Sequence, residues 1–128
     1  MIPVKQTLLG PEQGNCFAAC IASILELPIS SVPNFCLYHD WFQRVNEFLE
    51  PLGLCYIEVD ISASGLMYGL LNNNNFYVLS GKSPNYDCLH AVVAQGDVIV
   101  HDPHPDNKGL LDRQEVGLIV SLGRSYNE

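Results

Sequence analysis

The sequence predicts an α+β fold in which two helices precede an antiparallel sheet. Apolar residues recur at helical spacing in the first 52 positions, and later segments change to a period of two. Turn signals such as Gln-Gly-Asp at residues 95–97 separate the later segments, as in consecutive antiparallel strands. The length suits a single domain spanning residues 1–128.

The first predicted helix begins at Cys16, directly after Asn15, a residue type favoured at the N-cap. Pro28 ends it near Glu26 or Leu27. Its side chains are apolar on almost every face, so we expect a largely buried helix. Residues 7–14, rich in Gly and Pro, are predicted to form a loop before it.

A short helical turn is expected within residues 29–35, and a second helix over residues 39–52. Gly53 is the predicted end of this second helix, since glycine readily takes the left-handed conformation there. A further short helix is predicted over residues 65–71. The predicted strands span residues 54–59, 76–80, 89–94, 97–101 and 116–122.

Charge and composition restrict the class of partner. The formal net charge is −8, and no stretch combines Lys or Arg with aromatic residues, so we expect neither nucleic acid nor a membrane surface as partner. A secretory signal and a membrane span are both missing from the pattern, which predicts a complete cytoplasmic protein. The odd count of five cysteines, with no Cys-x-x-Cys pair, favours reduced thiols over disulfides or a zinc ribbon.

Cys16 is the predicted nucleophile because it lies in the first turn of a buried helix. Unpaired amides there carry partial positive charge, which favours the reactive thiolate. The amide of Cys16 is also suited to stabilise an oxyanion, and Gly14 allows a tight turn or close approach of a substrate. The alternative is that Cys16 only packs in the core, as Cys20 is expected to do.

His90 is the predicted base, and Asp102 the residue that orients it. If residues 95–97 form the turn, Ala94 pairs with Val98 and His90 pairs with Asp102 on the same face. One ring nitrogen would then bond Asp102 while the other faces Cys16. A register shifted by one residue would separate the two side chains, and an Asp before a proline also commonly starts a turn.

Other polar residues around this site have two interpretations each. His101, Asp102 and His104 are spaced closely enough for a metal site, although no fourth ligand is evident. His101 and His104 are instead expected at the mouth of the site, in contact with substrate. Gln6 and Gln13 are the candidate side-chain donors to the oxyanion. The predicted substrate-binding residues are Gly14, Asn15, Leu89, His101 and His104.

Residues 13–20, Gln-Gly-Asn-Cys-Phe-Ala-Ala-Cys, resemble the start of the nucleophile helix in papain-like cysteine peptidases. The likeness is greatest to the double-glycine leader peptidases of bacteriocin exporters. The segment is also similar to the Asp-Gly-Asn-Cys start of ovarian-tumour-type deubiquitinases, with Gln13 in place of the Asp. Residues 90–93 and 101–103 resemble the His-Ala-Val-Val and Asp-Pro segments of the leader peptidases.

This resemblance covers the whole chain, and it implies a papain-like fold with Cys16, His90 and Asp102 as the triad. The oxyanion glutamine of these peptidases lies near the position of Leu9 or Gly10, and Gln6 is the favoured substitute here. No transporter is attached, so leader processing is not implied. The chain looks like the small stand-alone proteins of phage and bacterial genomes.

The resemblance implies hydrolysis of a peptide or isopeptide bond in a peptide or protein substrate, with no cofactor and no metal. Amidase or acyltransferase chemistry by the same triad is an alternative. A non-catalytic module that binds a peptide or protein on the same fold is another.

Overall fold

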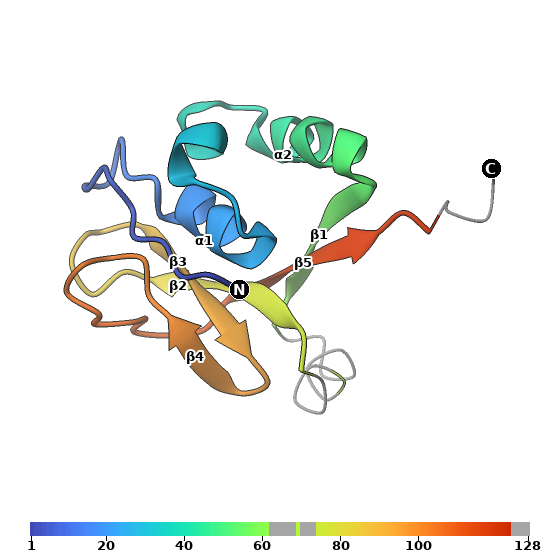
Figure 1. Cartoon of the computed structure of the whole chain (residues 1–128). Coiled ribbons are helices and arrows are strands. Elements are labelled where there is room, and N and C mark those ends of the chain that lie inside the picture. The colour runs from blue at the N-terminus through green and yellow to red at the C-terminus, as the bar shows by residue number, and fades with distance from the viewer. Residues whose placement is uncertain (62–68, 70–73, 124–128) are drawn as a thin grey trace.

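The computed structural model describes residues 1–61, 69 and 74–123. In this part of the chain two α-helices pack on a five-stranded antiparallel sheet, so the predicted α+β class is confirmed (Figure 1). The helices come first in the chain and lie together on one face of the sheet (Figure 1). The predicted short helix at residues 65–71 falls outside the described residues, apart from residue 69.

Helix α1 (Cys16–Leu25) begins at the predicted residue and is buried from Phe17 to Ser23. Glu26 closes it in the left-handed conformation, with φ of 60°, and its amide donates to the carbonyls of Ala22 and Ser23. The prediction that the helix ends just before Pro28 is therefore confirmed. Its burial on almost all sides follows from the lack of a polar face.

The second predicted helix is divided into α2 (Trp41–Leu49) and a 3₁₀ turn, η3 (Glu50–Leu52). Gly53 follows with φ of 74°, which confirms its predicted role as the end of the helical segment. The expected turn of helix after Pro28 is present as two 3₁₀ turns, η1 (Ile29–Ser31) and η2 (Phe35–Leu37).

The strands begin and end within two residues of the predicted positions. They are β1 (Leu54–Asp60), β2 (Phe76–Lys82), β3 (Leu89–Gln95), β4 (Val98–His101) and β5 (Glu115–Ser121). Their order across the sheet is β1-β5-β2-β3-β4. The last strand therefore lies between β1 and β2, which brings residues near position 115 beside both.

The predicted register of the β3–β4 hairpin is wrong. Gln95 pairs with Val98 and Ala94 pairs with Ile99, so the turn consists of Gly96 and Asp97 only. A bulge follows, and Val93 pairs with His101, which leaves Val100 unpaired. Strand β4 ends at His101, so Asp102 lies beyond the ladder rather than opposite His90.

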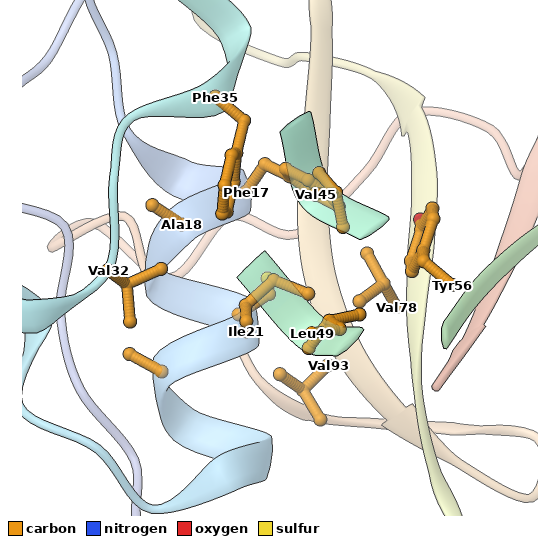
Figure 2. Close-up of a cluster of buried hydrophobic side chains, with 13 residues drawn as sticks. Phe17, Ala18, Ile21, Val32, Phe35, Val45, Leu49, Tyr56, Val78 and Val93 are labelled. Atoms are coloured by element: carbon orange, nitrogen blue, oxygen red, sulfur yellow. The ribbon is translucent and has the colours of Figure 1, made fainter. Parts of the chain in front are cut away.

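Two apolar clusters cover the two faces of the sheet. On the helical face, Phe17 and Ile21 of α1 meet Val45 and Leu49 of α2 above β-strand residues that include Val78 (Figure 2). The other face carries a smaller cluster around Tyr77, Leu79, Val92 and Val116. Complete burial of each such side chain stabilises the fold by about 1.5–3 kcal/mol. Helix α1 packs directly on β2 and β3, which places its first residue near the start of β3.

Candidate active site

Cys16 is the first residue of α1, and its thiol faces two adjoining cavities. The larger, here called the wide cavity, has a volume of about 280 Å³. The smaller, here called the narrow cavity, has a volume of about 100 Å³. Cys16, Cys36, Leu89 and His90 line both cavities. A molecule bound in either cavity would therefore contact both the predicted nucleophile and the predicted base.

Asn15 fixes the loop that leads to Cys16. Its side-chain oxygen accepts hydrogen bonds from the amides of Thr7 (3.0 Å) and Leu8 (2.9 Å), and its side-chain nitrogen donates to the Thr7 hydroxyl (2.9 Å). Asn15 occupies the predicted N-cap position of α1, but its side chain makes these loop contacts and no capping hydrogen bond. Asn15 is buried and lines neither cavity, so the structure does not bring it to the expected substrate-binding position.

Gly14 is required for the path of this loop. Its amide donates to the carbonyl of Gly10 at 3.1 Å, and a β-carbon at position 14 would lie 2.7 Å from that oxygen. Gly14 lines the narrow cavity, as expected for a residue beside the substrate. A side chain here would displace the loop that carries Cys16 into the helix.

His90 and Asp102 are in direct contact although the predicted ladder pairing does not exist. The His90 Nε2 atom lies 2.7 Å from Asp102 Oδ1, and both side chains are buried. The Cys16 thiol lies beside the same ring, since its proximity helps to raise the pKa of His90 and both residues line the two cavities. Because Nε2 is engaged with Asp102, Nδ1 is the nitrogen that remains for Cys16. The three predicted side chains therefore meet.

Asp102 is held by its own backbone contacts. Oδ1 also accepts from the amide of His104 at 2.9 Å, and Oδ2 accepts from the amide of Gly109 at 2.8 Å. Burial alone would raise the pKa of Asp102, but the hydrogen bonds from His90, His104 and Gly109 outweigh it and hold this pKa below its ordinary value. The carboxylate is thus ionised and fixed in orientation at neutral pH.

The electrostatics of His90 follow from the same contacts. Burial by itself lowers the pKa of the ring, because it disfavours the charged form. Hydrogen bonds to Asp102 and Cys16, and the electrostatic attraction of both, outweigh burial and raise the pKa of His90 to about 9. The ring is therefore a cation at neutral pH and loses its proton as the pH rises through about 9.

Replacing Asp102 by asparagine is expected to lower the pKa of His90 from about 9 toward its ordinary value, because the neighbouring negative charge is lost. Titration of the histidine ring carbons by NMR measures this directly. Asp106→Asn, which removes the carboxylate next to His104, serves as the matched control and should leave the His90 titration unchanged. An identical His90 titration in the Asp102 variant would contradict this account.

The segment before the loop is tied to the residues around Asp102. The Gln6 amide donates to the Pro103 carbonyl at 3.0 Å. The Lys5 ammonium donates to the carbonyls of Asp102 (2.9 Å) and His104 (3.1 Å). It also donates to the Asn107 side chain at 2.6 Å. These contacts hold the orienting carboxylate in a fixed relation to Gln6.

Of the two candidate glutamines, Gln6 lines the narrow cavity together with Cys16 and His90. Its Nε2 donates one hydrogen to the carbonyl of Leu8 at 2.9 Å, which leaves the second amide hydrogen for another acceptor. Gln13 is exposed and lines neither cavity. The structure therefore brings only the first of these glutamines to the nucleophile.

The remaining predicted residues have different positions. Leu89 is 52% exposed at the edge of both cavities, and His104 lines the narrow cavity with its ring 6.1 Å from that of His90. His101 is buried away from both cavities, with Nε2 2.7 Å from the carbonyl of Val4. The structure thus does not bring His101 to the substrate-binding position expected for it.

The alternative metal site at His101, Asp102 and His104 is not assembled. Within the described residues, no three His, Cys, Asp or Glu side chains are placed to hold a metal ion. His101 instead contacts Val4, and His104 Nδ1 lies 2.9 Å from Asp106 Oδ1.

Sequence reasoning missed several residues that line the wide cavity. Glu58 and Glu115 line it, together with the aromatic side chains of Trp41 and Tyr56. The sequence contained one signal. Tyr56 and Glu58 are two residues apart on β1, and side chains at this spacing lie on the same face of a strand. A carboxylate on the same face as a core tyrosine indicates either a partner or a function.

Comparisons with protein-family models, curated protein sequences and solved structures gave no match. Among the described residues, no helix has the length and apolar character needed to cross a membrane.

Proposed function

We propose that this protein is a papain-like cysteine hydrolase that cleaves a peptide or isopeptide bond through Cys16, His90 and Asp102. One observation carries the proposal. His90 Nε2 lies 2.7 Å from Asp102 Oδ1, while the thiol at the start of α1 lines the same two cavities as this ring and helps to raise its pKa. Nucleophile, base and orienting group are thus arranged in the order that covalent acyl transfer needs.

In the proposed reaction the Cys16 thiolate attacks the acyl carbon and forms a carbon–sulfur bond. The negative charge that develops on the oxygen is stabilised by the Cys16 amide and by the second side-chain hydrogen of Gln6. His90 then gives its Nδ1 proton to the leaving nitrogen, and the carbon–nitrogen bond breaks. The product of this half-reaction is a thioester on Cys16.

Water completes the cycle. His90, now neutral, takes a proton from a water molecule, and the resulting hydroxide attacks the thioester carbonyl. The acid product leaves, and the thiolate and the imidazolium are restored. Transfer of the acyl group to an amine in place of water would give acyltransferase chemistry from the same residues. Gly14, Leu89 and His104 are the residues along the cavities proposed to contact the substrate.

The cellular setting proposed is the cytoplasm. All five cysteines are free, and a reducing compartment keeps thiols in that state. A nucleophilic Cys16 with Cys36 and Cys88 in the same narrow cavity fits such a compartment best, because oxidation would consume the nucleophile.

Iodoacetamide is expected to alkylate Cys16 at pH 7 at least about tenfold faster than any other cysteine, because thiolate is the reactive form. The other thiols in the narrow cavity give a sharp contrast. Burial, followed by the charges of Cys16 and Glu58, raises the pKa of Cys36 to about 11. Burial, followed by the charges of Cys16 and Asp87, raises the pKa of Cys88 above its ordinary value.

Time-resolved peptide mapping by mass spectrometry assigns the rate to each cysteine. Cys88→Ala is the matched control and should leave the fast labelling at Cys16 intact. Slow and uniform labelling of all five cysteines would reject the hydrolase, and would favour a module that binds a peptide or protein without cleaving it.

A further inference from the structure

Two glutamates come together on the wall of the wide cavity. Glu58 of β1 pairs with Gly117 of β5, and Asp60 pairs with Glu115. Paired residues share a face, so Glu58 and Glu115 are diagonal neighbours on the face that the helices cover. Both line the cavity that Cys16 and His90 also line.

Among the described residues, no basic side chain forms an ion pair with either of the two carboxyl groups. Burial, then the charge of Glu115 and a hydrogen bond to it, raises the pKa of Glu58 to about 7. None of the groups that shift this pKa is basic. The two carboxyl groups can therefore reduce their repulsion only by sharing a proton. At neutral pH this stabilises them less than a neighbouring cation would.

The hydroxyl of Tyr56 completes a set of oxygen atoms. This side chain is only 3% exposed, and it lines the wide cavity together with both glutamates. The hydroxyl lies over Gly117, where a β-carbon would overlap it, and so lies beside the residue that pairs with Glu58. A phenolic hydroxyl both donates and accepts hydrogen bonds, so it adds a third oxygen to which a ligand in the cavity can donate.

We infer that Glu58, Glu115 and the Tyr56 hydroxyl bind a cationic side chain of the substrate, arginine or lysine, near the bond that Cys16 attacks. This inference rests on the proposed function, because the cavity joins these oxygens to the nucleophile. Trp41 and Tyr56 supply aromatic walls, which attract an organic cation through their ring faces. Within the described residues no three His, Cys, Asp or Glu side chains are placed to hold a metal ion, which favours an organic cation here.

Peptidyl chloromethyl ketones test the selectivity. The Cys16 sulfur displaces chloride from the methylene carbon, so the second-order rate of inactivation reports how well the peptide is held. Ala-Arg and Arg-Ala ketones are compared with their norleucine counterparts. We expect at least one arginine probe to react about tenfold or more faster than its norleucine partner, since a charge-assisted hydrogen bond contributes a difference of this size.

Glu58→Gln and Glu115→Gln should each lower the ratio of the arginine rate to the norleucine rate toward one. Glu50→Gln is the matched control, because it makes the same change in charge at an exposed residue outside both cavities. Equal rates for arginine and norleucine probes, with Cys16 still alkylated rapidly by iodoacetamide, would overturn the inference and leave the proposed function standing.

A second measurement does not depend on the reactivity of Cys16. Trp41 is the only tryptophan of the chain and lines the wide cavity, so its fluorescence reports binding there. Titration with N-acetyl-arginine methylamide should give a saturable change that is lost in Glu58→Gln, and N-acetyl-norleucine methylamide should give none. Saturation with both amides, or with neither, would reject the cationic site even if the protein proves not to be an enzyme.

Discussion

Replacing His90 by alanine is expected to slow the hydrolysis of a fluorogenic peptide-amide library at pH 7 by at least about a thousandfold. In the proposed reaction this ring delivers the proton that the leaving nitrogen needs. Without it, no group of the triad can protonate that nitrogen, and the amine would have to leave as an anion. The rate of fluorophore release, measured at equal protein concentration, gives the size of the effect.

Two controls separate this loss of chemistry from a loss of structure. His90 is buried, so His90→Gln, which fills more of the same space, should fold and still be inactive. His39→Ala removes an exposed histidine that lines neither cavity and should retain full activity. Circular dichroism checks that each variant keeps the native secondary structure. A folded His90 variant with ordinary turnover would contradict the proposed mechanism.

Replacing Gly81 by alanine is expected to destabilise the fold by about 2 kcal/mol or more. A β-carbon at this position would overlap the carbonyl oxygen of Asp112. The neighbouring segment is fixed there, since Asp112 Oδ1 accepts from the Lys82 amide at 2.7 Å and the Leu111 amide donates to the Lys82 carbonyl at 2.9 Å. The clash therefore breaks these contacts or bends β2.

Urea unfolding followed by circular dichroism measures the change in the free energy of unfolding. Lys82→Ala, one residue further along β2 and exposed, is the control and should change stability by less than about 0.5 kcal/mol. Because Gly81 pairs with His90 across the β2–β3 ladder, the alanine variant should also lower the reactivity of Cys16. An unchanged unfolding midpoint would show that the Asp112 segment moves freely, against the contacts described.

The fold class was predictable because it depends on local patterns. The apolar residues of α1, and the change of period near Gly53, are visible in short windows of sequence. The hairpin register was not predictable, because the bulge at Val100 depends on how β4 packs rather than on its residues. Asp102 still reaches His90, since it lies on a loop held by backbone amides and not on the strand.

The candidate site was likewise predictable only where local sequence patterns determine it. Cys16, His90, Asp102 and Gln6 were identified from short motifs, and the structure brings them together. Glu58 and Glu115 were not identified, because their meeting requires β5 to insert beside β1, a pairing between segments over 50 residues apart. Asn15 and His101 have the residue types of a site, yet their polar atoms hold the loops that surround it.

The hydrogen bonds from Lys5 and Gln6 to residues 102–104 affect the stage of protein synthesis at which the proposed active site can assemble. A chain emerging from the ribosome exposes Cys16 early, but its partner histidine and aspartate follow many residues later. Contacts between such distant segments form late in folding. If the proposed function holds, the nascent chain would therefore gain its cleavage activity only after residues 102–109 have been synthesised and have folded against the N-terminal segment.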